Sequence, residues 1–344
     1  MEAESDKNSR TYNRYIMEEL DKKKLAPRRM DFIMKPLSYK EINGILQVEF
    51  EMTPNPKRYE SIEFEGKPAL LDKSTHTVIP WDIMAEGMEI SREIPIFMTS
   101  PKQMDFCAYL KDRKAELLKN WDDKYFLEPN QRPVEELLEK LSGKKTYTVI
   151  LYVDLEGSTR LSSEMDAETY TKIIKIFLMQ MSKIIDNFRG YVLKFVGDCV
   201  IGIFPAEENF VNTCDNGIQA AIIMCSTVED VINPVFAAKG LPKIGFHIGV
   251  DIGLVSADRF GALDVTSVTD LIGYSMNLTA KIQSRAGHNE ILIGRQLYEL
   301  LHIDWQEYCE KVDLEEWKMK DPQREKIYEV YRCKAKWICK CWDK

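Results

Sequence analysis

The sequence predicts an α+β fold in which an antiparallel-rich mixed sheet is flanked by helices. A nearly continuous apolar and β-branched run, TYTVILYVD at 146–154, is typical of a buried strand. A long helical pattern follows, with apolar residues recurring every three or four positions between 170 and 188. Two strand-like runs, GYVLKFV and CVIGIF, are then joined by the turn dipeptide Gly197-Asp198. A hairpin inside a helix–strand alternation favours a layered α+β sandwich over a doubly wound parallel sheet.

The remaining elements continue this alternation. A second helix is predicted from about 210 to 231, followed by the strand KIGFHIGVDIG, a loop, a helix over 275–284, the strand ILIG and a short helix. The pattern divides the chain into five parts. We expect a polar arm at 1–30, an N-terminal α/β accessory region at 31–127, a linker at 128–145, the main domain at 146–301 and a C-terminal extension at 302–344.

Composition excludes several classes of protein. With 44% apolar and 30% charged residues, the 344-residue chain is not mainly disordered. Its net charge of -8 repels phosphate backbones, so we expect no nucleic-acid partner. We expect no membrane span, because the apolar runs are far shorter than the roughly 20 residues that a bilayer requires. The charged amino terminus does not resemble a secretory signal, so the expected location is cytoplasmic.

The eight cysteines do not suggest a disulfide framework. Three of them, Cys333, Cys339 and Cys341, crowd the tail without a histidine, and Cys309 is a possible fourth zinc ligand. The spacings match no common zinc pattern, so buried thiols are favoured.

Two acidic residues are placed where a nucleotide site would need them. Asp154 ends a buried strand and precedes Gly157, Ser158 and Thr159, which lead into a helix whose first amides attract phosphate. The alternative is that Asp154 and Ser158 only cap that helix. Asp198 lies at a hairpin tip that an antiparallel sheet can bring beside Asp154, and two carboxylates can bridge two divalent cations. The alternative for Asp198 is an ordinary turn residue.

A lysine and a histidine stand inside apolar strands. Lys194 requires a partner or ligand there unless it faces water at a sheet edge. Histidine often serves as a general base, but His247 lies within an apolar strand, so we expect it to be a hydrogen-bonded core residue.

Four segments in order resemble the catalytic domain of class III nucleotidyl cyclases. They are YVDLEGST, GYVLKFVGDCVIGIF, KIGFHIG and DLIGYSMNLTAKIQ, and the resemblance covers 146–301. It implies a ferredoxin-like catalytic fold that works as a head-to-tail homodimer, with a nucleoside triphosphate in the shared cleft. It further implies that Asp154 and Asp198 of one protomer, with the carbonyl of Leu155, hold two Mg²⁺ or Mn²⁺ ions.

The resemblance assigns the remaining site residues to the partner protomer or to the phosphates. Lys194 and Asp270 match the base-reading pair, and Asn277 matches the asparagine that orients the ribose and the reacting phosphate. Lys243 and Lys281 are expected near the terminal phosphates. Lys281 stands where the family pattern has an arginine, with Arg285 one turn further, and lysine lacks the planar fork that grips two oxygens.

The identity of the base remains open at this stage. A lysine donor beside an aspartate acceptor suits adenine and cytosine, and uracil and guanine also present a donor next to an acceptor. Tyr152, Phe195 and Tyr274 are bulky enough to restrict the pocket to one ring, unless they serve core packing.

The segment DLIGYSMNLTAKIQ most resembles the pyrimidine cyclases of bacterial Pycsar anti-phage systems. That resemblance favours CTP or UTP as substrate, a cyclic pyrimidine nucleotide as second messenger, and a separate effector that reads it. An adenylate cyclase is the first alternative. The second is a catalytically weak dimer that senses nucleotides, for which Lys281 is the support.

Overall fold

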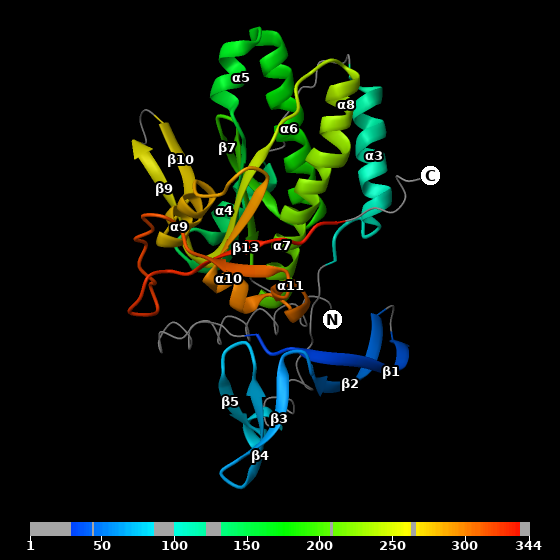
Figure 1. The fold of residues 1–344 in the computed structure, drawn as a ribbon, viewed down its shortest axis with the longest axis vertical. Coiled ribbons are helices and arrows are strands. Elements are labelled where there is room, and N and C mark those ends of the chain that lie inside the picture. Colours follow the sequence, from blue (N-terminus) through cyan, green and yellow to red (C-terminus); the bar gives the residue numbers. More distant parts are fainter. Residues whose placement is uncertain are drawn as a thin grey trace.

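The computed structural model describes residues 29–42, 45–85, 100–121, 132–206, 209–262 and 266–337. Nearly all of the predicted polar arm, and the cysteines at 339 and 341, lie outside these residues. Figure 1 shows a large body of helices around a sheet, with the strands of the N-terminal region at one end of it.

The body is built on an eight-stranded sheet with the order β12-β13-β11-β9-β6-β8-β7, and β10 pairs with β9. Every pairing is antiparallel except that of β11 with β9, so the predicted antiparallel-rich mixed sheet is confirmed. The strands are β6 (Lys145–Leu155), β7 (Tyr191–Val196), β8 (Cys199–Pro205), β9 (Phe246–Ala262), β10 (Thr266–Ile272), β11 (Glu290–Gly294), β12 (Cys309–Val312) and β13 (Val330–Cys333).

Strand β9 runs well past the predicted end of its segment near 253 and forms a hairpin with β10. The sequence analysis assigned this region to a loop. Its apolar side chains, such as Phe260 and Val268, are 43% and 61% exposed, so the segment buries too little to show a clear strand pattern.

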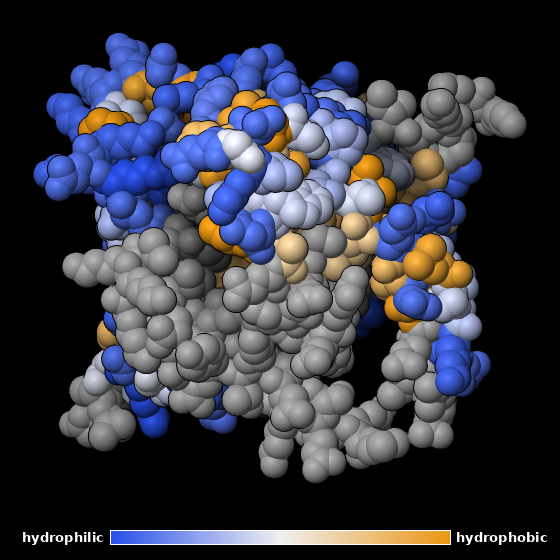
Figure 2. All heavy atoms as spheres, turned by 90° about the horizontal axis from the view of Figure 1, so that it is seen from below, coloured by the Kyte–Doolittle hydropathy of each residue, from blue (hydrophilic) through white to orange (hydrophobic). Residues whose placement is uncertain are grey.

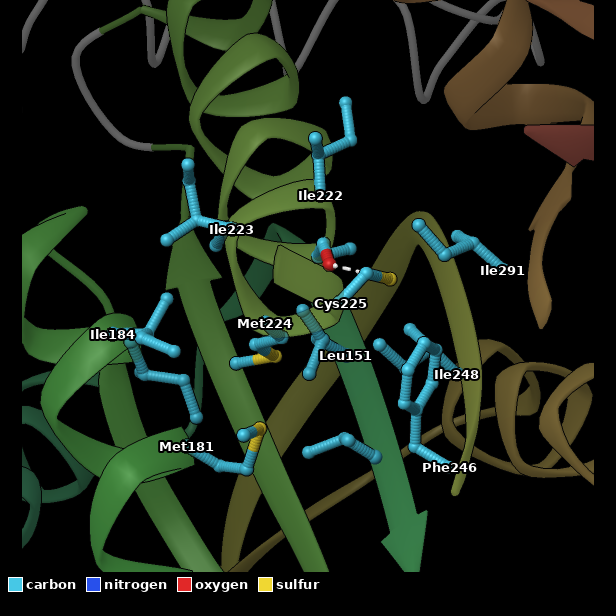
Figure 3. Close-up of a cluster of buried hydrophobic side chains, with 14 of the residues drawn as sticks. Leu151, Met181, Ile184, Ile222, Ile223, Met224, Cys225, Phe246, Ile248 and Ile291 are labelled. Atoms are coloured by element: carbon cyan, nitrogen blue, oxygen red, sulfur yellow. Dashed lines mark hydrogen bonds between the residues drawn. The ribbon is translucent and has the colours of Figure 1, made fainter. Parts of the chain in front are cut away.

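Helices cover one face of the sheet and enclose the main core. They are α5 (Ser158–Glu164), α6 (Ala167–Asn187), α7 (Phe210–Ser226), a π-helical turn (Thr227–Ile232) and α8 (Asn233–Ala238). Figure 3 shows Met181 and Ile184 of α6, Met224 of α7 and Leu151 of β6 in one cluster of buried side chains. Of the described helices, the stretch Phe210–Ala238 is long and apolar enough to cross a membrane. Within its most apolar window 72% is buried inside the protein, as in a core helix.

The other face of the sheet is covered in part by α4 (Arg132–Leu141), which lies in the segment expected to be a linker. Its apolar residues Val134, Leu137 and Leu141 follow helical spacing and pack toward Ile150 and Ile201 of the sheet. The segment before the main domain is therefore attached to the sheet surface.

Residues beyond 301 also join the sheet, since β12 and β13 extend it past β11. The chain between these two strands packs on α9 (Tyr274–Gln283), where Leu278 and Ile282 meet Trp317 and Tyr328. The short helices α10 (Arg295–Leu300) and α11 (Ile303–Gln306) precede β12.

The described part of the N-terminal region contributes two small strand assemblies and, among its helices, one that joins the main core. The strands are β1 (Phe32–Ile42), β2 (Ile45–Pro54), β3 (Tyr59–Phe64), β4 (Lys67–Asp72) and β5 (Thr77–Pro80). Tyr59, Leu70 and Met84 form a separate small core. Ion pairs from Arg29 to Asp215 and from Lys57 to Asp304 join these strands to the body.

One helix of this region is integrated differently. Helix α3 (Phe106–Lys119) places Phe106, Leu110 and Leu117 in the main core of the body. The view from below in Figure 2 shows that hydrophobic and hydrophilic residues are interspersed on the described part of that side.

Candidate active site

Strand pairing brings Asp154 and Asp198 together. Asp154 is the penultimate residue of β6, and its direct partner on β8 is Cys199. Asp198 is the turn residue before Cys199, and its carboxyl hydrogen-bonds to that of Asp154. The antiparallel register therefore places two acidic groups from distant parts of the sequence in contact.

The surroundings of Asp154 disfavour its negative charge. Burial, followed by the charge of Asp198 and the hydrogen bond with it, raises the pKa of Asp154 to about 6. The amide of Leu155 and the side chain of Gln283, the last residue of α9, act in the opposite direction by donating to the carboxylate. Gln283 was not identified from the sequence, and only its place at the end of the helix that carries Asn277 could have suggested it.

The donor set fits hard divalent cations. Oδ2 of Asp198 is buried and has no hydrogen-bond partner among the described residues. A buried carboxylate oxygen without a partner is costly, and a cation would satisfy it. Because the available donors are carboxylate and carbonyl oxygens, the site suits Mg²⁺ or Mn²⁺. Within the described ranges no group of three or more histidine, cysteine or acidic side chains is arranged to hold a metal, so further oxygens would come from a ligand.

Two neighbours flank Asp154 in register. Cys199 lies opposite it on β8 and His247 lies opposite it on β9, and directly paired residues share one face of a sheet. Burial, then Asp154 and Asp198, raise the pKa of the Cys199 thiol to about 12. His247 is half-buried beside Asp154 on this face of the sheet, rather than the core histidine that was expected.

The loop after β6 does not show the helix capping that was the alternative role for Asp154 and Ser158. Helix α5 begins at Ser158 after Gly157, which has a left-handed φ of 68°, and no side chain caps its amides. Thr159 is exposed in the first turn. The side chain of Glu156 pairs instead with His288, which ties this loop to the one before β11.

The predicted base-reading pair is assembled within one chain. Lys194 of β7 forms an ion pair with Asp270 of β10, and their side chains are 42% and 27% exposed. Lys194 thus has a partner, although β7 is an edge strand. A register shift between Val192 and Lys194 shows that β7 is irregular at this position.

The three bulky side chains near this pair differ in burial. Tyr152 lies two residues before Asp154 on the same sheet face, and burial raises its pKa to about 12, with Cys199 and Asp270 adding to the effect. Phe195 and Tyr274 are 37% and 41% exposed, so neither is a core residue. The Tyr274 hydroxyl donates to the carbonyl of Lys320 at 2.6 Å.

The remaining predicted residues are exposed. Asn277 and Lys281 lie one turn apart on the solvent side of α9, and Lys243 precedes β9. Within the described chain, no hydrogen bond or ion pair links these three to Asp154 or Asp198. Among the residues of α9, Gln283 is the one that acts on the charge of Asp154 within the interactions described for that carboxyl.

Comparison with known proteins agrees with this arrangement. Residues 142–332, more than half of the chain, match the model of the adenylate and guanylate cyclase catalytic domain. The chain belongs to this family. The match begins within the predicted linker and continues to the last sheet strand, past the expected boundary at 301.

Proteins similar to this chain include pyrimidine cyclases. The chain is 30% identical over 156 residues to the uridylate cyclase of Rhodovulum sp. (strain MB263), a match of 43% of this chain and 63% of that protein. It is 23% identical over 184 residues to the cytidylate cyclase of Escherichia coli, covering 52% and 38% respectively. The chain thus spans less than two thirds of the length of either relative.

A solved structure is also similar. The adenylyl cyclase CyaB from P. aeruginosa is 25% identical, with a TM-score of 0.47, over 55% of this chain and 94% of that one.

Proposed function

We propose that this protein is a nucleotide cyclase that converts CTP or UTP into the 3′,5′-cyclic monophosphate and pyrophosphate. The observation that carries the proposal is the contact between Asp154 and Asp198, with a buried, unpartnered oxygen on Asp198. In a member of the cyclase family, that arrangement is suited to binding the cations of a nucleoside triphosphate.

The cations would be held by Asp154, Asp198 and the carbonyl of Leu155. Two Mg²⁺ or Mn²⁺ ions supply charge neutralisation for the triphosphate and acidify the ribose 3′-hydroxyl there. The 3′-oxygen attacks the α-phosphorus in line, a new P–O bond forms, the bond to the pyrophosphate oxygen breaks, and the hydroxyl proton leaves to solvent.

The other residues position the substrate. Lys194 and Asp270 read the base edge with one donor and one acceptor, and Asn277 orients the ribose and the reacting phosphate. Lys243 and Lys281 neutralise the departing pyrophosphate. Gly157, Ser158 and Thr159 present the start of α5 to the phosphates.

The site requires a second copy of the chain. Asn277 and Lys281 are exposed, and among the described residues no hydrogen bond or ion pair links them to the acidic pair of their own chain. Several apolar side chains beside the base-reading pair are also exposed, which favours burial against a partner. They are Phe195, Val196, Phe260, Val268 and Ile272.

A pyrimidine substrate is supported by the uridylate and cytidylate cyclases among the relatives. The bulky, half-buried Tyr152, two residues before Asp154 on the same sheet face, is a further candidate for narrowing the pocket. The resulting cyclic nucleotide would act as a second messenger in the cytoplasm, read by a separate effector in anti-phage defence. Adenylate cyclase activity is the alternative, because the Lys194–Asp270 pair also matches adenine. A nucleotide sensor without turnover is supported by Lys281 alone.

The first test incubates purified protein and Mn²⁺ with ATP, GTP, CTP or UTP and identifies products by mass spectrometry. We expect cyclic CMP or cyclic UMP to dominate. Asp154→Asn and Asp198→Asn should each lower turnover by at least about 100-fold. Asp186→Asn, which alters only an exposed ion pair with Lys102, is the matched control. Turnover unaffected by the first two substitutions would rule the mechanism out.

The second test examines sharing of the site. The purified Asp154→Asn and Asn277→Ala proteins are mixed in equal amounts. A dimer with one copy of each variant has one site that carries both substitutions and one intact site. Random pairing predicts about one quarter of wild-type turnover. If the mixture remains at the level of the separate variants, the site is not shared between protomers.

A further inference from the structure

Cys309 and Cys333 face each other across the last two strands of the sheet. They are direct partners in the antiparallel register of β12 and β13. The amide of Lys334 donates to the carbonyl of Tyr308 at 2.8 Å, which identifies the cysteine pair as a narrow, non-hydrogen-bonded pair. Cα atoms at such a position are about 4.5 Å apart, which lies within the range that a disulfide spans.

The two thiols interact electrostatically. The Cys309 thiol donates to the carbonyl of Trp305 at 3.3 Å. The interaction with Cys309 lowers the pKa of the Cys333 thiol, which favours the nucleophilic thiolate. Cys309 is half-buried and Cys333 is 6% exposed, so a small oxidant can reach them more readily than a protein can.

The pair lies at the open end of the β12–β13 ladder, three residue pairs from the segment that packs on α9. The chain from Asp313 to Glu329 leaves β12 and returns through β13. Within it, Trp317 and Tyr328 pack on Leu278 and Ile282, and the carbonyl of Lys320 accepts the hydrogen bond of Tyr274. We call this segment the α9 support.

We infer that Cys309 and Cys333 form a dithiol site that a hydroperoxide oxidises reversibly to a disulfide, which clamps the strands that carry the α9 support. The site lies outside the candidate active site and does not depend on the proposed function. Of the cysteines considered for zinc, Cys309 and Cys333 are direct partners, whereas Cys339 and Cys341 lie outside the described residues; a two-cysteine bridge uses the first placement directly.

The reaction is balanced with hydrogen peroxide as oxidant. The Cys333 thiolate attacks one peroxide oxygen, the O–O bond breaks, and a sulfenic acid and hydroxide result. The Cys309 sulfur attacks the sulfenic sulfur, the S–S bond forms, the S–O bond breaks and water leaves. The Cys309 proton leaves with that water, and the hydroxide takes up the proton that Cys333 released on forming its thiolate, so two thiols and one peroxide give one disulfide and two waters. A dithiol such as dithiothreitol reverses the step by thiol–disulfide exchange.

The experiment uses the full chain. Protein treated with a slight excess of hydrogen peroxide is alkylated and digested without reduction, and mass spectrometry locates the linked peptides. We expect a Cys309–Cys333 link, 2 Da below the sum of the free peptides, which disappears with dithiothreitol. Cys107→Ser, at another half-buried thiol, should leave the link intact, whereas Cys309→Ser should abolish it. Links that join other cysteines instead would overturn the assignment.

The clamp is tested separately by hydrogen exchange, with the wild-type chain compared before and after oxidation. Oxidation should slow exchange several-fold in 313–329 and in α9, and peroxide should have no such effect on Cys309→Ser. Unchanged exchange in α9 after complete oxidation would refute the clamp. Nucleotide turnover enters neither readout, so failure here is distinct from failure of the proposed cyclase activity.

Discussion

Replacing Tyr328 by phenylalanine tests the buried polar cluster behind α9. Tyr328 is 1% exposed, and its hydroxyl donates to Oδ2 of Asp251 at 2.7 Å and accepts from the amide of Gln296 at 2.9 Å. Oδ1 of Asp251 accepts from the amides of Ile252 and Leu297. Tyr328→Phe therefore removes one donor and one acceptor from a fully enclosed site.

The loss of folding stability caused by Tyr328→Phe depends on the charge of Asp251. Burial raises the pKa of Asp251 from 3.8 to about 7. Between about pH 4 and about pH 7 the carboxyl is therefore protonated in the folded state but ionised in the unfolded state. This contribution to stability is complete below pH 4 and is lost as the pH rises through 7. The Tyr328 hydrogen bond lowers the pKa of Asp251, so its removal costs more when the carboxylate is charged.

The magnitude follows from the two lost bonds. At pH 8 a hydrogen bond to a charged group is worth about 1.5–3 kcal/mol, and an orphaned buried amide adds about 1–2 kcal/mol. We expect a loss of about 3–4 kcal/mol in the free energy of unfolding at pH 8 and about 2 kcal/mol at pH 5.5.

The assay is urea unfolding followed by circular dichroism at both pH values. Tyr331→Phe is the matched control, because that half-buried hydroxyl only donates to the Glu329 carboxylate at 3.3 Å, and we expect a loss below about 1 kcal/mol. A Tyr328→Phe penalty that equals the control, or that is the same at both pH values, would refute the reasoning.

Three further predictions concern the site and the N-terminal strands. Asp154→Asn should raise the free energy of unfolding by about 1 kcal/mol at pH 8 in the presence of EDTA, because it removes a partly buried contact between two like charges. Thermal melts measure this change, and a lower melting temperature would contradict it. Lys281→Arg should raise kcat several-fold, because a guanidinium grips two phosphate oxygens; kinetics without any gain would mean that a point charge is sufficient. Arg29→Ala should accelerate proteolytic cleavage between the N-terminal strands and the body, because the ion pair between Arg29 and Asp215 is largely shielded from solvent. Lys35→Ala, which removes an exposed ion pair with Glu51, should leave the cleavage rate unchanged.

The sequence alone was sufficient to predict the α+β class and the proximity of Asp154 to Asp198. The reason is local: a buried strand, a two-residue hairpin turn and alternation of side chains fix which residues end beside one another. It was also sufficient to pair Lys194 with Asp270, through the family resemblance rather than through any pattern in the residues.

The tertiary structure decided the neighbours that come from other segments. Gln283 reaches Asp154, α4 covers the second sheet face, and Cys309 faces Cys333, yet no local spacing links any of these partners. Such contacts arise when separate apolar faces are buried against one another, and burial is a property of the whole packed chain. For the same reason the exposed β9–β10 hairpin gave little signal, while the sheet extends beyond 301 because β11 accepts β13 as a partner.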